Sequence, residues 1–387
     1  TGFIEFDRVA FRTAGRTALA DGESLAGGTG GPRAAGGTAA ATRDWWAFLA
    51  ATERATTRRL VKLLKEELKV RVPVTDTQAD YGGAAGILRE SGECDYLDAH
   101  AYWEHPDFFK GAWDPEFWRI GNSSQVRSAA GGVLADLAFA RVQGKPFTIS
   151  EYNTPNPSDY GAETIPLLSL VGAFQDWDAV MPYTYMDFKT EWDADRLVGF
   201  FDLAGNPGKL VFAPSCARAF RNGLVASGRT PVTLTLPAGS APELLATGRS
   251  PVRGLWAGAG VDAAAVTMRR LAIRVDPAAT AITASEPVRT KATRVSDTGE
   301  VSWIPAESQL TVTAPAVRLA AGAVAGRTIP VGDLKLRFGR WSSGHAVLTA
   351  VALDERPLAG SAQIMVCVAA RVENQGMGWN GDRTSVG

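Results

Sequence analysis

The hydrophobic and polar positions in the first 225 residues follow two alternating patterns, short β-branched or apolar runs and longer runs with helical spacing. The short runs predict strands over residues 70–77, 96–102, 146–151 and 179–185. The longer runs predict helices over residues 84–90, 123–143, 163–175 and 209–222. Because strands that alternate with helices form right-handed βαβ crossovers, we expect a parallel sheet.

The segment before this alternation divides into a predicted loop and a predicted helix. Residues 21–42 are rich in Gly, Ala and Thr without apolar periodicity, which predicts a loop. A helix is predicted to begin near Thr42, with Asp44 in its first turn. Its apolar positions form one stripe that we interpret as core packing, comprising Trp45, Phe48, Leu49, Leu60, Leu63, Leu64 and Leu68.

The pattern changes after about residue 225 to short alternating runs separated by Gly, Pro and Asp. These runs predict strands over residues 230–236, 271–275, 309–314, 334–338, 346–353 and 363–372. Such spacing is typical of an antiparallel β-sandwich. The predicted organisation is therefore an α/β domain over residues 1–225 and an all-β accessory domain over residues 226–387. We expect the sandwich to be incomplete at its C-terminus.

Composition excludes several classes of partner. Forty Lys and Arg residues against 41 Asp and Glu residues leave almost no net charge, which favours neither nucleic acid nor an anionic membrane surface. No apolar run approaches the ~18 residues of a membrane span. A neutral carbohydrate partner fits this balance, while the oligomeric state is left open.

Motifs for cofactors, metals and other hydrolases are missing from the sequence. It contains no Gly-x-Ser-x-Gly elbow, no Walker loop and no HExxH, so no cofactor is predicted. His100, Glu104 and His105 lie on a strand and a loop, which does not favour a zinc site. The three cysteines lack paired spacing, and Cys94 and Cys367 are predicted to be buried thiols.

One carboxylate stands out because it lies where an apolar strand meets a loop. Glu151 follows Thr148-Ile149-Ser150 and precedes Tyr152-Asn153. A retaining glycosidase needs one carboxylate to attack the anomeric carbon and a second about 5–5.5 Å away to protonate the leaving oxygen. Glu151 is therefore a candidate nucleophile. The alternative is a glutamate at a loop edge in a surface ion pair.

The preceding predicted strand ends in a second polar cluster. His100 and Tyr102 are two residues apart, so they share one face of the strand. A tyrosine hydroxyl near Glu151 could hydrogen-bond its carboxylate, although both side chains could equally pack in the core. Aromatic residues crowd the strand ends and suit the apolar faces of sugar rings. The candidates for contact with a sugar are His100, Tyr102, Trp103, Asn153, Tyr183 and Tyr185.

Three segments resemble the clan-A glycoside hydrolases, the (β/α)8 enzymes that include glycoside hydrolase family 5. Residues 98–103 (DAHAYW) are similar to the His-x-Tyr of the sixth barrel strand. Residues 144–153 (GKPFTISEYN) resemble the seventh strand with its nucleophile, and residues 178–185 (DAVMPYTY) resemble the eighth. The resemblance covers roughly residues 44–223. It implies a partial TIM-type barrel, about strands 5–8, and a retaining glycosidase with Glu151 as nucleophile.

The chain departs from this family at the acid/base. The family places that glutamate after Asn at the end of strand four, and no Asn-Glu dipeptide occurs here. Glu5 is a poor substitute, so we expect the acid/base and four strands to lie upstream of a truncated chain. The alternative is a non-catalytic carbohydrate-binding relative or an inactive fragment. A secreted, periplasmic or extracellular location is expected, although the chain carries no signal peptide.

Overall fold

The computed structural model describes residues 39–114, 116–186, 195–197, 199–379 and 383–384. Glu5 and residues 21–38 of the predicted loop lie outside the described residues. Residues 39–42, the end of that predicted loop, are already helical. The first part of the chain contains α1 (Ala39–Lys62), a π-helical turn (Leu63–Glu67), α2 (Ala84–Glu93), β1 (Leu97–Tyr102), β2 (Asp107–Phe108) and β3 (Trp118–Arg119).

The elements that follow complete the parallel region. They are a 3-10 turn (Gln125–Arg127), α3 (Gly132–Ala140), β4 (Phe147–Asn153), a second 3-10 turn (Gly161–Glu163), α4 (Thr164–Gln175), β5 (Ala179–Pro182), α5 (Pro207–Leu210) and α6 (Ala213–Arg221). The predicted helix over residues 123–143 is thus confined to its C-terminal half.

A parallel sheet with the order β1-β4-β5 confirms the expected α/β character. The three strands lie side by side in the order in which they occur in the chain, and β2 and β3 form a separate pair. The predicted strand over residues 70–77 is wrong, because only Gln78 pairs with the sheet, through an isolated parallel bridge to Asp98. Pro73 has no N–H to donate to a ladder. The Val74 carbonyl instead accepts a hydrogen bond from the backbone N–H of Asp95, and the Val74 N–H donates to the Asp95 side chain, ahead of β1.

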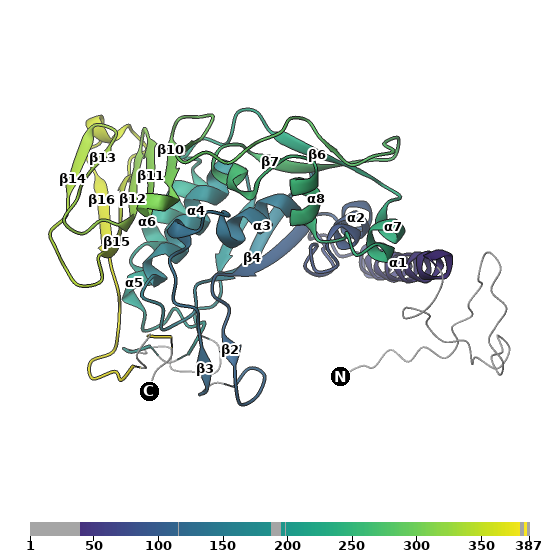
Figure 1. Ribbon diagram of the computed structural model, residues 1–387, viewed down its shortest axis with the longest axis horizontal. Helices are drawn as coiled ribbons and strands as arrows, with labels where there is room; N and C mark the ends of the chain where they lie inside the picture. Colours follow the sequence, from purple (N-terminus) through teal and green to yellow (C-terminus); the bar gives the residue numbers. More distant parts are fainter. Residues whose placement is uncertain (1–38, 115, 187–194, 198, 380–382, 385–387) are drawn as a thin grey trace.

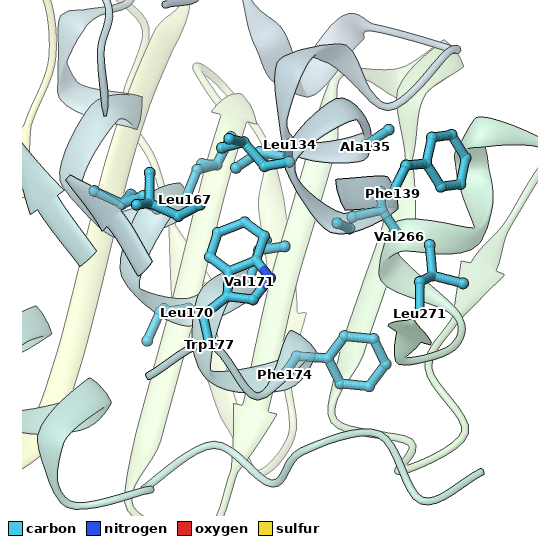
Figure 2. Packing of buried hydrophobic residues seen from close by; sticks show 14 of the residues in the cluster. Leu134, Ala135, Phe139, Leu167, Leu170, Val171, Phe174, Trp177, Val266 and Leu271 are labelled. Carbon is cyan, nitrogen blue, oxygen red and sulfur yellow. The ribbon is translucent and has the colours of Figure 1, made fainter. Parts of the chain in front are cut away.

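Helices α3 and α4 bury one face of this sheet. Leu134, Phe139, Leu167 and Val171 are among their buried side chains, and they pack as one cluster (Figure 2). Trp177, which follows α4, lies 6.3 Å from Phe147 of β4, centroid to centroid. The opposite face carries polar side chains and forms the site described below.

The apolar stripe of α1 is only partly buried. α1 lies at one end of the molecule and packs against α2 and α7 (Ala241–Ala246) (Figure 1). Leu60, Leu63 and Leu68 are exposed, so the prediction that they pack in the core is wrong.

Residues 226–290 form a second parallel unit instead of the first strands of a sandwich. β6 (Val232–Pro237) pairs in parallel with β7 (Leu271–Asp276), and β8 (Thr283–Ala284) pairs antiparallel with β6. Between β6 and β7 lie α7, α8 (Val252–Gly258) and a 3-10 turn (Ala263–Thr267). The prediction that 230–236 and 271–275 belong to an antiparallel sandwich is therefore wrong. β7 and the turn before it pack on α3 and α4 (Figure 2).

The last part of the chain is antiparallel, as expected. A six-stranded sheet has the order β16-β15-β12-β11-β10-β9. Its strands are β9 (Arg294–Val295), β10 (Val301–Ile304), β11 (Gln309–Ala314), β12 (Val317–Ala323), β15 (His345–Ala352) and β16 (Ile364–Ala369). 3-10 turns occupy Pro305–Glu307 and Leu358–Gly360.

Different layers cover the two faces of this sheet. On one face lies the hairpin of β13 (Thr328–Val331) and β14 (Leu334–Arg337), where Ile329 and Val331 pack on Ala320 and Ala346. On the other face, helix α6 packs against β15. One cluster of buried hydrophobic residues extends from the parallel sheet, through α3, α4 and α6, to Trp303 on β10 and Val347 on β15.

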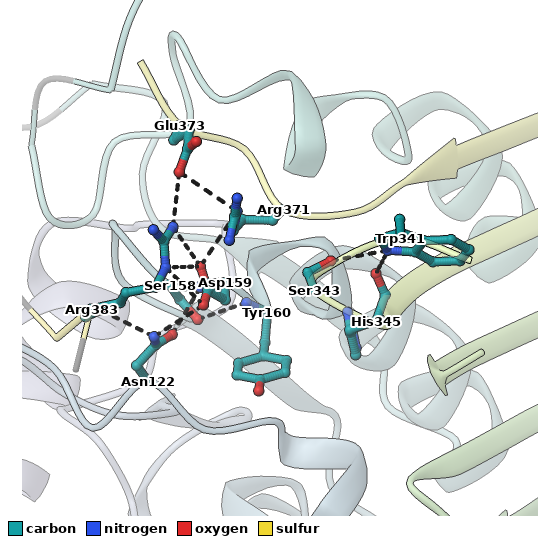
Figure 3. A network of polar contacts seen from close by, with 10 residues as sticks. All are labelled: Asn122, Ser158, Asp159, Tyr160, Trp341, Ser343, His345, Arg371, Glu373 and Arg383. Atoms are coloured by element: carbon teal, nitrogen blue, oxygen red, sulfur yellow. Dashed lines mark hydrogen bonds and ion pairs between the residues drawn. The ribbon is translucent and has the colours of Figure 1, made fainter. Parts of the chain in front are cut away.

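The C-terminal segment runs back from β16 to the loop that follows β4. Arg383 pairs with Asp159 at 3.0 Å and with Glu373 at 2.9 Å (Figure 3). The side chain of Asn122 donates to the carbonyl of Arg383. The segment therefore ties the antiparallel sheet to the loops at the carboxyl end of β4.

Candidate active site at the carboxyl ends of the parallel strands

A cavity of about 700 Å³ opens at the carboxyl ends of β1, β4 and β5. It is lined by Gln78, Tyr81, His100, Ala101, Tyr102, His105, Trp113, Glu151, Tyr183 and Phe201. Four of the predicted site residues, His100, Tyr102, Glu151 and Tyr183, therefore meet in one place. In α/β folds this end of the sheet is where ligands bind.

Glu151 reaches the cavity because β4 contains a bulge. The register against β1 shifts so that Ile149 faces Ala99 and Glu151 faces His100, which leaves Ser150 as an extra residue. Both Ser150 and Glu151 consequently contact the imidazole of His100. The Tyr102 hydroxyl donates a hydrogen bond to Oε2 of Glu151. His100 Nδ1 lies 3.3 Å from the same oxygen.

His100 lies between two carboxylates. Its Nε2 is 3.0 Å from Oδ2 of Asp98, and its Nδ1 faces Glu151. Burial disfavours the charged imidazolium, but the hydrogen bond to Asp98 and the charges of Glu151 and Asp98 raise the pKa of His100. A protonated imidazole therefore hydrogen-bonds Asp98 and forms an ion pair with Glu151.

Asp98 is held in turn by hydroxyl groups on β4. Burial opposes the ionisation of Asp98, yet hydrogen bonds from His100, Ser150 and Thr148 lower its pKa. Ser150 Oγ donates to Oδ2 of Asp98 at 2.5 Å. Because Asp98 comes two residues before His100, the period of a strand places both side chains on one face. That spacing could have indicated Asp98 from the sequence alone.

Asn153 does not line the cavity, so its prediction as a sugar contact is wrong. Its side chain is fully buried and donates to the carbonyls of Tyr183 and Phe201. Its Oδ1 accepts a hydrogen bond at 2.9 Å from the buried amine of Lys209. Asn153 therefore fastens the ends of β4 and β5 and the loop before α5 to one another.

The structure does not bring Trp103 and Tyr185 to the cavity wall. Trp103 donates from its indole nitrogen to the carbonyl of Ser123 at 2.8 Å. Tyr185 is partly exposed beyond the end of β5. Neither belongs to the residues that line the cavity.

Aromatic residues outside the predicted set of sugar contacts line the cavity in their place. Phe201 stacks on Tyr102 with ring centroids 4.2 Å apart, and His105 lies edge-on to both rings. Trp113 comes from the segment between β2 and β3 and contacts His105. Phe201 lies in a loop without periodicity, so no pattern in the sequence indicates it.

Glu151 is the one carboxylate among the described residues that line the cavity. The described lining therefore offers no second carboxylate to serve as the acid/base of a retaining pair. Within the described ranges, no group of three His, Cys, Asp or Glu side chains is arranged to hold a metal ion. Cys94, Cys216 and Cys367 are buried free thiols, as predicted for Cys94 and Cys367.

No protein-family model, curated protein or solved structure matches this chain. None of the helices in the described ranges is both long enough and apolar enough to cross a membrane.

Proposed function

We propose that this protein is a retaining glycoside hydrolase in which Glu151 attacks the anomeric carbon of a poly- or oligosaccharide. The observation that carries the proposal is the carboxylate at the end of β4, held by Tyr102 and His100 at the wall of an open cavity. Both contacts lie on Oε2, so Oε1 is the oxygen available for attack. The hydrogen bond from Tyr102 and the imidazole of His100 fix the direction of this carboxylate.

The order of the parallel strands supports the finer proposal of a partial (β/α)8 barrel. Gln78, β1, β4 and β5 are adjacent in the order in which they occur in the chain. A doubly wound sheet reverses its strand order at a switch point, whereas a barrel continues in sequence. We propose that these elements correspond to barrel strands five to eight, and that the acid/base comes from a segment outside the described residues.

A second candidate function is a carbohydrate-binding protein without hydrolysis. It is favoured by the absence of a second carboxylate from the described wall of the cavity. Such a protein would retain sugar binding at the aromatic residues but would form no glycosyl-enzyme.

Covalent labelling with 2-deoxy-2-fluoroglycosides that carry a dinitrophenolate leaving group tests the proposal. Dinitrophenolate leaves without protonation, so the chain can be labelled at its nucleophile even where the acid/base is lacking. A panel of gluco, xylo, manno and galacto reagents covers the unknown sugar. We expect mass spectrometry to find one fluoroglycosyl group per chain, attached to Glu151.

Two glutamine variants supply the controls for this labelling. Glu151→Gln should abolish it. Glu104→Gln should not, because Glu104 lies at the end of the neighbouring strand, where its carboxylate accepts from Ser123 instead of facing the cavity. Labelling at any other carboxylate contradicts the assignment. If no reagent labels the chain but oligosaccharides bind to it, the non-catalytic function is supported.

A further inference from the structure

The segment between β2 and β3 carries a tryptophan into the cavity. β2 and β3 form a short hairpin that projects from the body of the molecule near the C-terminal segment (Figure 1). Trp113 lies in its loop and lines the same cavity as Glu151. The side chain is 54% exposed, although tryptophan is usually well buried in a folded chain.

The backbone at Trp113 has a conformation that a bulky side chain rarely adopts. Its φ is +62°, in the left-handed region that favours glycine. Gly111 lies two residues earlier in the same loop, where a side chain would meet no other atom. The loop therefore contains a glycine, but not at position 113, where the backbone conformation favours one. Residues that keep such a conformation against its cost are concentrated at functional sites.

Contacts with two aromatic rings hold the indole of Trp113 in place. Trp113 lies 5.6 Å from His105 and 5.3 Å from Phe108, centroid to centroid. Phe108 rests in turn on Phe200 at 5.2 Å. Since the ring is positioned before any ligand binds, little rotational freedom is lost when a ligand covers its exposed surface.

The charges at the cavity wall restrict the kind of ligand. Neither Lys nor Arg occurs among its described lining residues, and the imidazole of His100 is already paired with Asp98 and Glu151. The described wall therefore offers no Lys or Arg to pair with a sulfate or a uronate, whereas a neutral sugar needs no such partner. A volume of about 700 Å³ falls in the range of sites for ligands larger than one sugar ring.

We propose that Trp113 binds the apolar face of a pyranose ring next to the one held at Glu151, so that the substrate is a neutral oligosaccharide chain. This inference rests on the proposed function for the position of the reacting ring. Trp113 is then a specificity-determining residue, which favours a chain over a simple monosaccharide glycoside.

The experiment compares Trp113→Ala with Phe109→Ala in the full chain. Phe109 belongs to the same hairpin and is equally exposed at 56%, but it does not line the cavity. Calorimetry measures the binding of neutral gluco-, xylo- and manno-hexasaccharides and of a hexagalacturonate. We expect at least one neutral chain to bind and Trp113→Ala to raise its Kd by about 10- to 100-fold. Phe109→Ala should change Kd by less than about twofold.

A conservative variant separates ligand contact from folding. Trp113→Tyr retains a flat ring and should recover most of the affinity, while thermal unfolding verifies that every variant is folded. Equal losses in Trp113→Ala and Phe109→Ala would overturn the inference. So would unchanged affinity in Trp113→Ala, tighter binding of the galacturonate, or no binding of any neutral chain.

Labelling of Glu151 by the monosaccharide reagents distinguishes the two proposals. Its rate should change by less than about twofold in Trp113→Ala, because the reagent does not extend to this ring. If Glu151 is labelled and Trp113→Ala binds the chains normally, the further inference alone fails. If Glu151 is never labelled while Trp113→Ala weakens binding, the hydrolytic function fails and the sugar contact stands.

Discussion

The imidazole of His100 links two acidic side chains that would otherwise repel one another across β1 and β4. Asp98, Glu151 and the more distant Asp80 all favour its protonated form. Because the pKa of His100 is raised on folding, its charge stabilises the folded state fully below the unfolded value of about 6.5. This stabilisation is lost as the pH rises through the folded pKa.

We therefore expect the destabilisation caused by His100→Asn to depend on pH. The difference in unfolding free energy from the parent protein should be larger at about pH 5.5 than at about pH 9, as measured by urea unfolding. His105→Asn is the control, because His105 bonds the backbone carbonyl of Pro106 instead of a carboxylate. A cost of His100→Asn that stays constant with pH would contradict a charged imidazole.

The prediction of Asn153 as a sugar contact failed because of the contacts that this one residue makes. Strict alternation from Glu151 places residue 153 on the same face, at the cavity. The register of β4 against β1 is regular from Glu151 to Asn153, so the bulge at Ser150 does not account for the difference. Asn153 is instead buried by contacts with Phe201 and Lys209, which come about 50 residues later in the chain. The local pattern of the strand carries no information on such a distant contact. The position of Glu151 at the strand end was predictable, whereas the orientation of its neighbours was not.

At the scale of elements, α5 fixes the end of β4 through one buried lysine. Lys209 Nζ donates to Oδ1 of Asn153 and, at 2.5 Å, to the carbonyl of Thr154. Burial lowers the pKa of Lys209 to about 7, while the charge of Asp202 opposes this shift. Between this pH and its unfolded value of about 10.4 the unfolded chain binds more protons, so folding gains stability as the pH rises.

Lys209→Met tests this contact. Loss of the amine leaves two buried oxygens without their donor, which should cost roughly 1–3 kcal/mol. The cost should be larger at about pH 10 than at about pH 6 in chemical unfolding, because only the parent gains stability over that interval. Lys145→Met is the matched control, since Lys145 also donates to a backbone carbonyl, that of Cys94, but is only part-buried. The same pH dependence in both variants would contradict the effect of burial.

Sequence periodicity predicted some elements well and missed others for physical reasons. β4 and α4 were placed within about two residues of their ends, because each has a long uniform pattern. The parallel pairing of β6 and β7 was missed. The helices between them have six and seven residues, too few for a helical period to emerge beside β-branched runs. Pairing direction depends on such connections, and the strands alone do not encode it.

At the scale of the whole molecule, the antiparallel sheet is joined to the loops of the candidate site by a buried polar contact. His345 on β15 lies 2.7 Å from Oε1 of Glu163, just before α4. Glu163 also accepts from the Ser124 hydroxyl and the Gln125 backbone. The contact therefore joins the loop after β4, the segment before α3 and the sheet, within a hydrophobic cluster that extends across both parts.

Since both parts share that cluster, calorimetry should show a single unfolding transition for the parent protein. His345→Leu should lower the unfolding free energy by about 1–3 kcal/mol, because it removes one hydrogen-bond partner from a buried side chain. Arg218→Ala removes an exposed pair with Glu355 that also joins α6 to the region of the sheet, and should cost about 1 kcal/mol or less. Two separate transitions in the parent, or equal costs for the two variants, would show that the sheet does not stabilise the loops that carry the site.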